Sequence, residues 1–375
     1  MFRQFRAHTA ACAVLALATG CGGDGTDTPA PNPDASSATD TTSPGDTTSA
    51  GDTAGATTTY APFQQANLEN QLVRVAGFQT IQTLRKAADF SAGHFGSCKD
   101  WNPKGTSPTD AKKIASLYVE SAELQTKIQG RKDAHAYAKD APVGLAIDAS
   151  ICSAIDAGAA AGAVARKAVG SIDWHAQVVD KGLQHFFYIA VYGYLVHGTR
   201  KGYDEGVGYY GMSLDGKVAS GVALTVKSRD DNCSTQYGKD IWAGLLKGRN
   251  LLDTALKAAG KTGNDDKLDA LTPELVANAA DLDAKLLEVF ALSMGREMLG
   301  IQKGTDASIK LIEGRMFFRI LKNRIAEHDK AKGTTYAKDL AALLEQDDAA
   351  KADPDKVLAA VKAIWGFDVA TLCTK

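Results

Sequence analysis

The sequence lacks the short motifs that mark the common classes of catalytic site. It contains no serine nucleophile elbow, no phosphate-binding loop, no dinucleotide fingerprint and no His-Glu-x-x-His segment. Strand-like alternation is also scarce, and the stretch Val218–Val226 is the only one with a β character. The chain therefore offers no complete catalytic set, and its fold class must come from helical patterns.

A charge excess of either sign is missing as well. The formal net charge of the chain is -2, and the stretch 22–59 holds six aspartates and no lysine or arginine. Setting aside these aspartates and the N-terminal Arg3 and Arg6, residues from 60 onward carry 40 basic and 38 acidic side chains. This balance, without a dense basic cluster, excludes nucleic acid or an anionic membrane face as the main partner.

A long hydrophobic run is absent from the N-terminus. The apolar run Ala10–Ala18 follows two arginines but is shorter than the about 20 residues that span a bilayer. It ends in Leu17–Cys21, which resembles the lipobox at which bacterial lipoproteins are lipidated on cysteine and cleaved. The resemblance implies a signal peptide over 1–20 and a lipid on Cys21, which anchors the protein to a membrane. The alternative is an ordinary secretory signal cleaved near Ala18.

Residue 22 is glycine and not aspartate. By analogy with lipoprotein sorting in Gram-negative bacteria, this favours the outer membrane over the inner one. The stretch that follows, 22–59, is almost entirely Gly, Asp, Thr, Ser, Ala and Pro and has no aromatic or large aliphatic residue to bury. We expect residues 21–59 to form a disordered tether with an r.m.s. reach of about 30–35 Å.

Cysteine is scarce, with six in the chain, of which Cys12 belongs to the predicted signal and Cys21 to the lipid site. The four that remain are Cys98, Cys152, Cys233 and Cys373. An even number in an oxidising compartment predicts two disulfides with three possible connectivities. The most local connectivity pairs Cys98 with Cys152 and Cys233 with Cys373. A four-cysteine zinc site is disfavoured because the cysteines are dozens of residues apart.

Helical periodicity dominates the body, 60–375. Apolar residues recur at three- and four-residue steps from Leu68 to Leu84, and Ser107–Asp110 has the character of a helix start. Further helices are predicted at about 145–168, 172–197, 204–213, 235–260, 273–301, 305–331, 334–347 and 354–365. No second linker interrupts the body. The predicted fold is all-α: one multi-helix unit, either a single bundle or a two-lobed one.

The helix predicted at 172–197 stands out because residues 182–199 contain no formal charge. Its polar residues and glycines favour a central buried helix over a membrane span, with Gly198 as its C-terminal stop. On this helix His185, Tyr188 and Tyr192 share one face. If the chain reverses after Gly198, Asp204 and Glu205 begin the next, antiparallel helix.

These residues are the candidate site. The predicted ligands of a divalent metal or iron are His185, Asp204 and Glu205. The predicted ligand-cleft residues are Tyr188, Tyr192 and Tyr209. Each has a structural alternative: a hydrogen-bonded core histidine, two acids that complement a helix dipole, and tyrosines packed in the core.

Two resemblances follow from the same region. The segment Tyr203–Gly211, preceded by the helix of Lys181–Leu183, resembles a family of uncharacterised bacterial lipoproteins usually written with Trp-Asp-Glu-Ala-Phe-Gly-Tyr. The segment Tyr60–Phe63, with Gln71 and Arg74, fits the start of that family. This chain departs from it in having tyrosine for the tryptophan and Gly-Val for Ala-Phe. The resemblance implies a fold family without a reaction.

The second resemblance is more distant. The segment Gly182–Tyr188 is similar to the Gly-x-His-x-x-Glu-Tyr signature of imelysin-like periplasmic proteins, which are helical and linked with iron uptake or peptidase activity. Here an extra residue separates Gly182 from His185, and Phe187 or Tyr188 stands where the acidic residue belongs. The resemblance adds metal uptake and metallopeptidase activity to the expected functions.

Three functions are therefore expected. The first is a binding or accessory lipoprotein without catalysis, with metal (iron) uptake as the expected associated process. Its expected partners are the membrane, through its lipid, and another envelope protein. The second is an imelysin-like metallopeptidase, which needs a metal with an open coordination position. The third is a structural envelope protein in which the motif serves packing alone.

Overall fold

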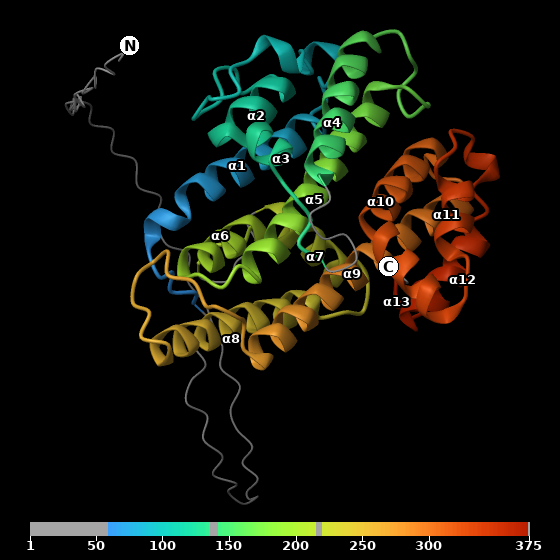
Figure 1. The fold of residues 1–375 in the computed structure, drawn as a ribbon. Helices are drawn as coiled ribbons and strands as arrows, with labels where there is room; N and C mark the ends of the chain where they lie inside the picture. Colours follow the sequence, from blue (N-terminus) through green and yellow to red (C-terminus); the bar gives the residue numbers. More distant parts are fainter. Residues whose placement is uncertain (1–58, 136–141, 215–219, 374–375) are drawn as a thin grey trace, which may run out of the picture. The chain divides into compact units, whose positions relative to one another are not determined.

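The computed structural model describes residues 59–135, 142–214 and 220–373 (Figure 1). The predicted signal peptide 1–20, Cys21 and the predicted tether up to residue 58 lie outside the described residues. The α-helices are α1 (Glu69–Leu84), α2 (Ile114–Glu120), α3 (Leu124–Gln129), α4 (Val143–Ala160), α5 (Ile172–Leu195), α6 (Arg200–Tyr210), α7 (Gly221–Asn232), α8 (Tyr237–Ala258), α9 (Pro273–Gln302), α10 (Ala307–Lys332), α11 (Tyr336–Leu344), α12 (Pro354–Trp365) and α13 (Val369–Leu372). Short 3-10 turns lie at Gln65–Asn67, Ala92–His94, Cys98–Asp100, Ser121–Glu123 and Ala349–Lys351.

The predicted all-α class is confirmed. Within the described ranges the structure has no strand, and an isolated antiparallel bridge joins Thr199 to Lys267. The described helices belong to one compact unit. Its core is continuous, because buried side chains from α1 through α12 form a single hydrophobic cluster.

The helix α5 is the centre of this core, as its composition predicts. The Ser171 side chain accepts a hydrogen bond from the backbone N–H of Trp174 and so caps the first turn. Most of its side chains are buried, and it packs against α4, α6 and α10. Gly198 has a φ of +81°, the left-handed conformation that lets the chain reverse after the helix.

The next helix, α6, begins four residues earlier than predicted. The Thr199 hydroxyl accepts a hydrogen bond from the backbone N–H of Gly202 at 2.9 Å, which sets the start at Arg200. Asp204 and Glu205 therefore lie inside the helix and do not complement its dipole from the first turn. A Cβ on Gly208 would lie 2.8 Å from the Cβ of Gln71, so glycine there allows α6 to approach α1 closely.

Three other boundaries differ from the expectations. The stretch predicted at Val218–Val226 is not a strand in its described part, because the residues from Gly221 onward lie in α7, where Val222 and Val226 are four residues apart and both buried. The helix α2 begins at Ile114 and not near Ser107. The helix predicted at 145–168 is α4, which ends at Ala160.

The helix α4 is also long and apolar enough to cross a membrane by length and composition alone. Its contacts assign it to the helical body, since it packs against α3 and α5. Cys152 of α4 is also bonded to Cys98 of the 3-10 turn Cys98–Asp100, which lies between α1 and α2. Gly158 of α4 allows the Phe95 ring to pack closely against the helix, because a Cβ at this position would lie 2.3 Å from the ring.

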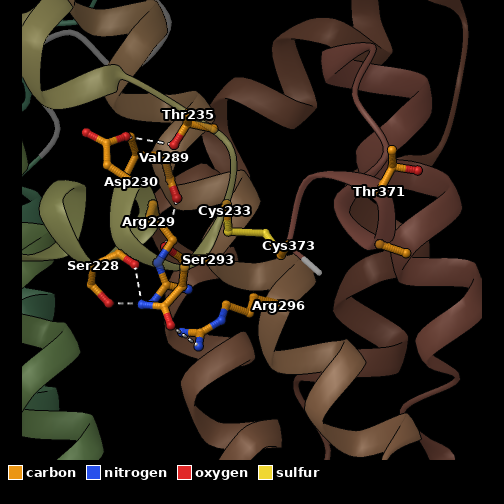
Figure 2. The surroundings of a disulfide bond; sticks show 12 residues. Ser228, Arg229, Asp230, Cys233, Thr235, Val289, Ser293, Arg296, Thr371 and Cys373 are labelled. Carbon is orange, nitrogen blue, oxygen red and sulfur yellow. Dashed lines mark hydrogen bonds between the residues drawn. A yellow bond between two sulfur atoms is a disulfide. The ribbon is translucent and has the colours of Figure 1, made fainter. Parts of the chain in front are cut away.

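The two disulfides have the most local of the three possible connectivities. Cys98 is bonded to Cys152, and Cys233 is bonded to Cys373. Figure 2 shows the second bond, which joins the residue after α7 to the residue after α13, beside Arg229 and Arg296. Both cysteines of this bond are buried, so the disulfide fastens the C-terminal segment from inside the body.

Candidate functional site

The carboxylate of Asp204 binds the first residues of the body. It is fully buried and accepts hydrogen bonds from the Tyr60 hydroxyl at 2.7 Å and the Asn67 amide at 2.8 Å. The backbone N–H groups of Phe63 and Gln64 donate two more, each at 3.1 Å. Four donors occupy both carboxylate oxygens. Asp204 is therefore an internal anchor for the segment before α1, and its predicted role as a metal ligand is not supported by this arrangement.

Aromatic and cationic side chains reinforce this anchor. The Arg249 guanidinium lies 4.2 Å from the Phe63 ring centroid and 5.9 Å from that of Tyr60. Arg200, from the first turn of α6, lies 5.7 Å from the Phe63 ring on the same segment. Such cation–π contacts are individually modest. Together with the hydrogen bonds to Asp204 they hold the segment 60–67 against α6 and α8.

Glu205 faces different neighbours, although it is the next residue. Burial raises the pKa of its carboxyl, while hydrogen bonds with Tyr194 and Gln71 and the nearby charges of Lys201 and Arg74 act in the opposite direction. Glu205 thus joins α6 to α1 and to the end of α5. Among the described residues it shares no hydrogen-bond partner with Asp204.

Tyr209 does not line a ligand cleft, contrary to the prediction. It is buried, and its hydroxyl accepts a hydrogen bond from the Arg74 guanidinium at 2.7 Å. Its ring stacks on that of Tyr194, with centroids 5.7 Å apart. Arg74 also donates to the carbonyl of Ala122 at 2.9 Å. The core-packing alternative is therefore the correct one for Tyr209.

The face of α5 predicted to carry a site does converge on polar groups, and His135 is their centre. The Tyr188 hydroxyl lies 3.1 Å from His135 Nε2, and the Tyr192 ring stacks on the His135 ring with centroids 3.8 Å apart. Asp133 lies 2.6 Å from Nδ1, and Asp283 of α9 lies 3.0 Å from Nε2. Tyr188 also donates to Asp283 at 2.7 Å.

This arrangement makes His135 a cation at neutral pH. Burial acts to lower the pKa of His135, but the hydrogen bonds and charges of Asp133 and Asp283 outweigh it and raise the pKa to about 9. The result is a buried imidazolium between two carboxylates, packed against two tyrosines. Asp133 and His135 were not predicted from the sequence, because they lie in the connection between α3 and α4, where no helical periodicity marks them. Their one signal was an Asp-x-His spacing in a loop.

His185 lies elsewhere on α5, at a cleft between α4, α5 and α10 with a volume of about 260 Å³. The lining residues are Val143, Ala146, Ile147, Ser150, Gly182, His185, Met316 and Arg319. Burial lowers the pKa of His185 below its usual range, Asp133 opposes this, and Arg319 and His135 add to it. His185 is therefore neutral at neutral pH. None of the described residues forms a hydrogen bond with its ring.

The three predicted metal ligands therefore have separate surroundings. His185 lies at the cleft, Asp204 binds the segment before α1, and Glu205 contacts Tyr194 and Gln71. Across the described ranges no group of three His, Cys, Asp or Glu side chains is placed to hold a metal ion. The predicted three-ligand site is wrong because α6 begins at Arg200, which turns Asp204 toward the segment 60–67.

The chain matches no protein family, curated protein or solved structure with which it was compared. The site is therefore judged on its own geometry. At Asp204 and at His135, protein groups satisfy the hydrogen bonds of the buried charge. The small cleft at His185 is different, because polar groups that line it have no hydrogen-bond partner among the described residues.

Proposed function

We propose that this chain is a lipid-anchored extracytoplasmic protein whose helical body has a binding or accessory role. The observation that carries the proposal is the pairing of Cys98 with Cys152 and of Cys233 with Cys373. Disulfides of this kind form and persist in oxidising compartments outside the cytosol. They agree with the N-terminal charge, the short apolar run and the lipobox-like segment ending at Cys21.

The anchor at Asp204 supports the same role. The residues that a motif search would select, Tyr60, Phe63 and Asp204, contact one another and hold the beginning of the body. A protein suspended by an N-terminal lipid needs such a junction, because any force on the connecting segment acts first on its point of attachment. The residues of the motif then serve to attach the segment 60–67 to the helical body, and we assign the binding role to the cleft at His185.

Metabolic labelling of the full chain tests the anchor. The protein is produced in a Gram-negative host fed with an alkyne analogue of palmitate, and label is measured after membrane fractionation. We expect label on the wild type and on Cys12→Ser, the matched control within the signal. Cys21→Ser should lose the label and leave the membrane fraction. Equal labelling of Cys21→Ser, or a wild type without label, would contradict lipid attachment at this residue.

Density-gradient separation of the two membranes tests the location. We expect the labelled protein in the outer membrane, because residue 22 is glycine. The change Gly22→Asp should move it to the inner membrane fraction, while Gly23→Asp serves as a control for added charge alone. A wild type in the inner membrane would remove the outer-membrane assignment and leave the lipid anchor intact.

A further inference from the structure

We propose that the cleft between α4, α5 and α10 binds a short aliphatic carboxylate, whose carboxylate group meets Ser150, His185 and Arg319. The inference rests on the binding role proposed for the helical body and is independent of the lipid anchor. It goes further by assigning a site and a ligand class.

The size of the cleft limits the ligand. A volume of about 260 Å³ is below the range of about 300–1,000 Å³ typical of drug-sized ligands. At about 30 Å³ for each water, it has room for roughly eight or nine water-sized groups. A six-carbon carboxylate such as hexanoate has that size.

The wall of the cleft selects for hydrocarbon over a bare inorganic anion. Val143, Ala146 and Ile147 of α4 and Met316 of α10 provide apolar side chains. An alkyl chain that displaces water from these groups gains about 25 cal/mol for each Å² of apolar surface that is buried. An inorganic phosphate or sulfate would gain nothing from this part of the wall.

The polar groups of the cleft come from three different helices and are rich in donors. No described residue forms a hydrogen bond with the Ser150 hydroxyl or the His185 ring. The Arg319 guanidinium uses Nε and Nη2 for Glu345, at 3.1 and 2.6 Å. Among the described residues, the hydrogen-bond partner of its Nη1 is the Met316 sulfur, at 3.7 Å. A hydroxyl, an imidazole N–H and a guanidinium N–H together suit an acceptor with negative charge.

The charges around His185 make binding depend on protonation. The charged groups that act on the ring are Asp133 and His135, from the connection before α4, and Arg319 from α10. Arg319 forms a salt bridge with Glu345, the residue that follows α11. A bound carboxylate adds a negative charge beside a neutral imidazole. Ligand binding should therefore raise the pKa of His185, and affinity should increase as the pH falls toward this raised pKa, until the carboxylate of the ligand is itself protonated below about pH 5.

Proton NMR of the histidine rings tests the proposal on the oxidised protein, with sodium hexanoate as the probe. The His185 signals are assigned from the spectrum of His185→Gln. We expect a saturable shift of these signals with a dissociation constant on the order of 1 mM, as befits so small a ligand. The pKa of His185 should rise at saturation. Hexan-1-ol, which has the same chain without the charge, should bind at least about tenfold more weakly.

Variants separate a binding role from a structural one. Ser150→Ala and Arg319→Gln should each weaken hexanoate binding by about tenfold. Glu345→Gln should strengthen it about threefold, because it removes the carboxylate that competes for Arg319. A variant that merely perturbed the fold would not tighten binding. Circular dichroism confirms the helical content of each variant.

Two outcomes would overturn the proposal: hexanoate that leaves the His185 signals unchanged, or hexan-1-ol that binds as tightly as hexanoate. Both are distinct from failure of the proposed function. A chain that carries the palmitate label on Cys21 but does not bind hexanoate is an anchored protein with no carboxylate site. A chain that binds hexanoate without the label has the site and lacks the anchor.

Discussion

Asp204 and His185 were predicted to share a metal ion, yet their surroundings are opposite. Asp204 is completely buried and accepts four hydrogen bonds from the segment 60–67. His185 borders a cleft and receives no hydrogen bond from the described residues. A polar group whose hydrogen bonds are all satisfied by protein stabilises the fold, whereas an unpaired group beside free volume is available to a ligand. Whether protein groups satisfy its hydrogen bonds, and not its residue type, decides which of the two roles a polar side chain has.

The largest expected effect is that of Asp204→Ala. Four donors would lose their common acceptor, and a buried donor left without a partner costs about 1–3 kcal/mol. With partial relaxation we expect the free energy of unfolding to fall by about 3–5 kcal/mol, measured by urea denaturation with circular dichroism. Glu205→Gln is the matched control on the same helix, with an expected loss below about 1 kcal/mol. Equal losses for the two variants would contradict the anchor.

The second prediction concerns His135. Like the Asp204 carboxylate, its ring has hydrogen-bond partners at all its polar atoms, since Nδ1 and Nε2 each lie near a carboxylate. Its pKa is raised to about 9 in the folded state, against an ordinary value of 6.5. The stabilisation is therefore complete below about pH 6.5 and is lost as the pH rises through about 9. We expect at most about 3 kcal/mol from this source.

The measurement is the free energy of unfolding of the wild type and of His135→Gln at pH 7 and pH 10. The wild type should lose more stability than the variant over this range. Other groups that titrate between pH 7 and pH 10 affect both proteins equally, so the difference between the two losses reports on His135. Identical losses would show that His135 is not protonated at neutral pH. His94, which lies in the 3-10 turn Ala92–His94 and is not buried, supplies a control variant, His94→Gln.

A smaller effect is expected from Tyr60→Phe, which removes one of the four donors to Asp204 and keeps the ring beside Arg249. Hydrogen bonds to charged groups contribute about 1.5–3 kcal/mol, and we expect the loss near the lower end because three donors remain. Thermal and urea unfolding measure it. In the double variant with Asp204→Ala, the Tyr60→Phe change should cost much less than it does alone, because the two groups interact directly.

The smallest effect on stability at pH 7 is expected for His185→Gln, about 0.5 kcal/mol or less, because no described hydrogen bond is lost. Its effect is expected in acid. Since the folded pKa of His185 is lowered from 6.5, the stability linked to the neutral ring is complete above about pH 6.5 and declines as the pH falls below it. The variant should lose less stability between pH 7 and pH 5 than the wild type. A larger loss in the variant would mean that His185 has a stabilising partner.

Helix positions could be predicted where local signals agree. The uncharged run 182–199 belongs to the helix predicted at 172–197, which agrees with α5, Ile172–Leu195, to within two residues. The boundary of α6 was wrong because Thr199, a good N-cap residue, was passed over in favour of the acidic pair. The helix α7 was missed because Val222 and Val226 are spaced for a helix as well as for a strand.

The candidate site was harder to predict. Tyr188 and Tyr192 were predicted to share a face with His185, but only the two tyrosines contact His135, whereas His185 borders the cleft. Their partners Asp133 and His135 come from a loop, and Asp283 comes from α9. Contacts that join three distant segments leave no periodic trace in the sequence. Only the packing of α5 against its neighbours brings them together.

The sequence by itself determined the helical class, the four cysteines available for disulfides and the approximate extent of most helices. Periodicity, capping residues and cysteine count are local properties, and they act through the chain alone. The tertiary structure decided which polar groups are satisfied. Whether Asp204 meets four donors and His185 none depends on which surface each residue presents after α4, α6 and α10 have packed on α5, and on the space that this packing leaves open.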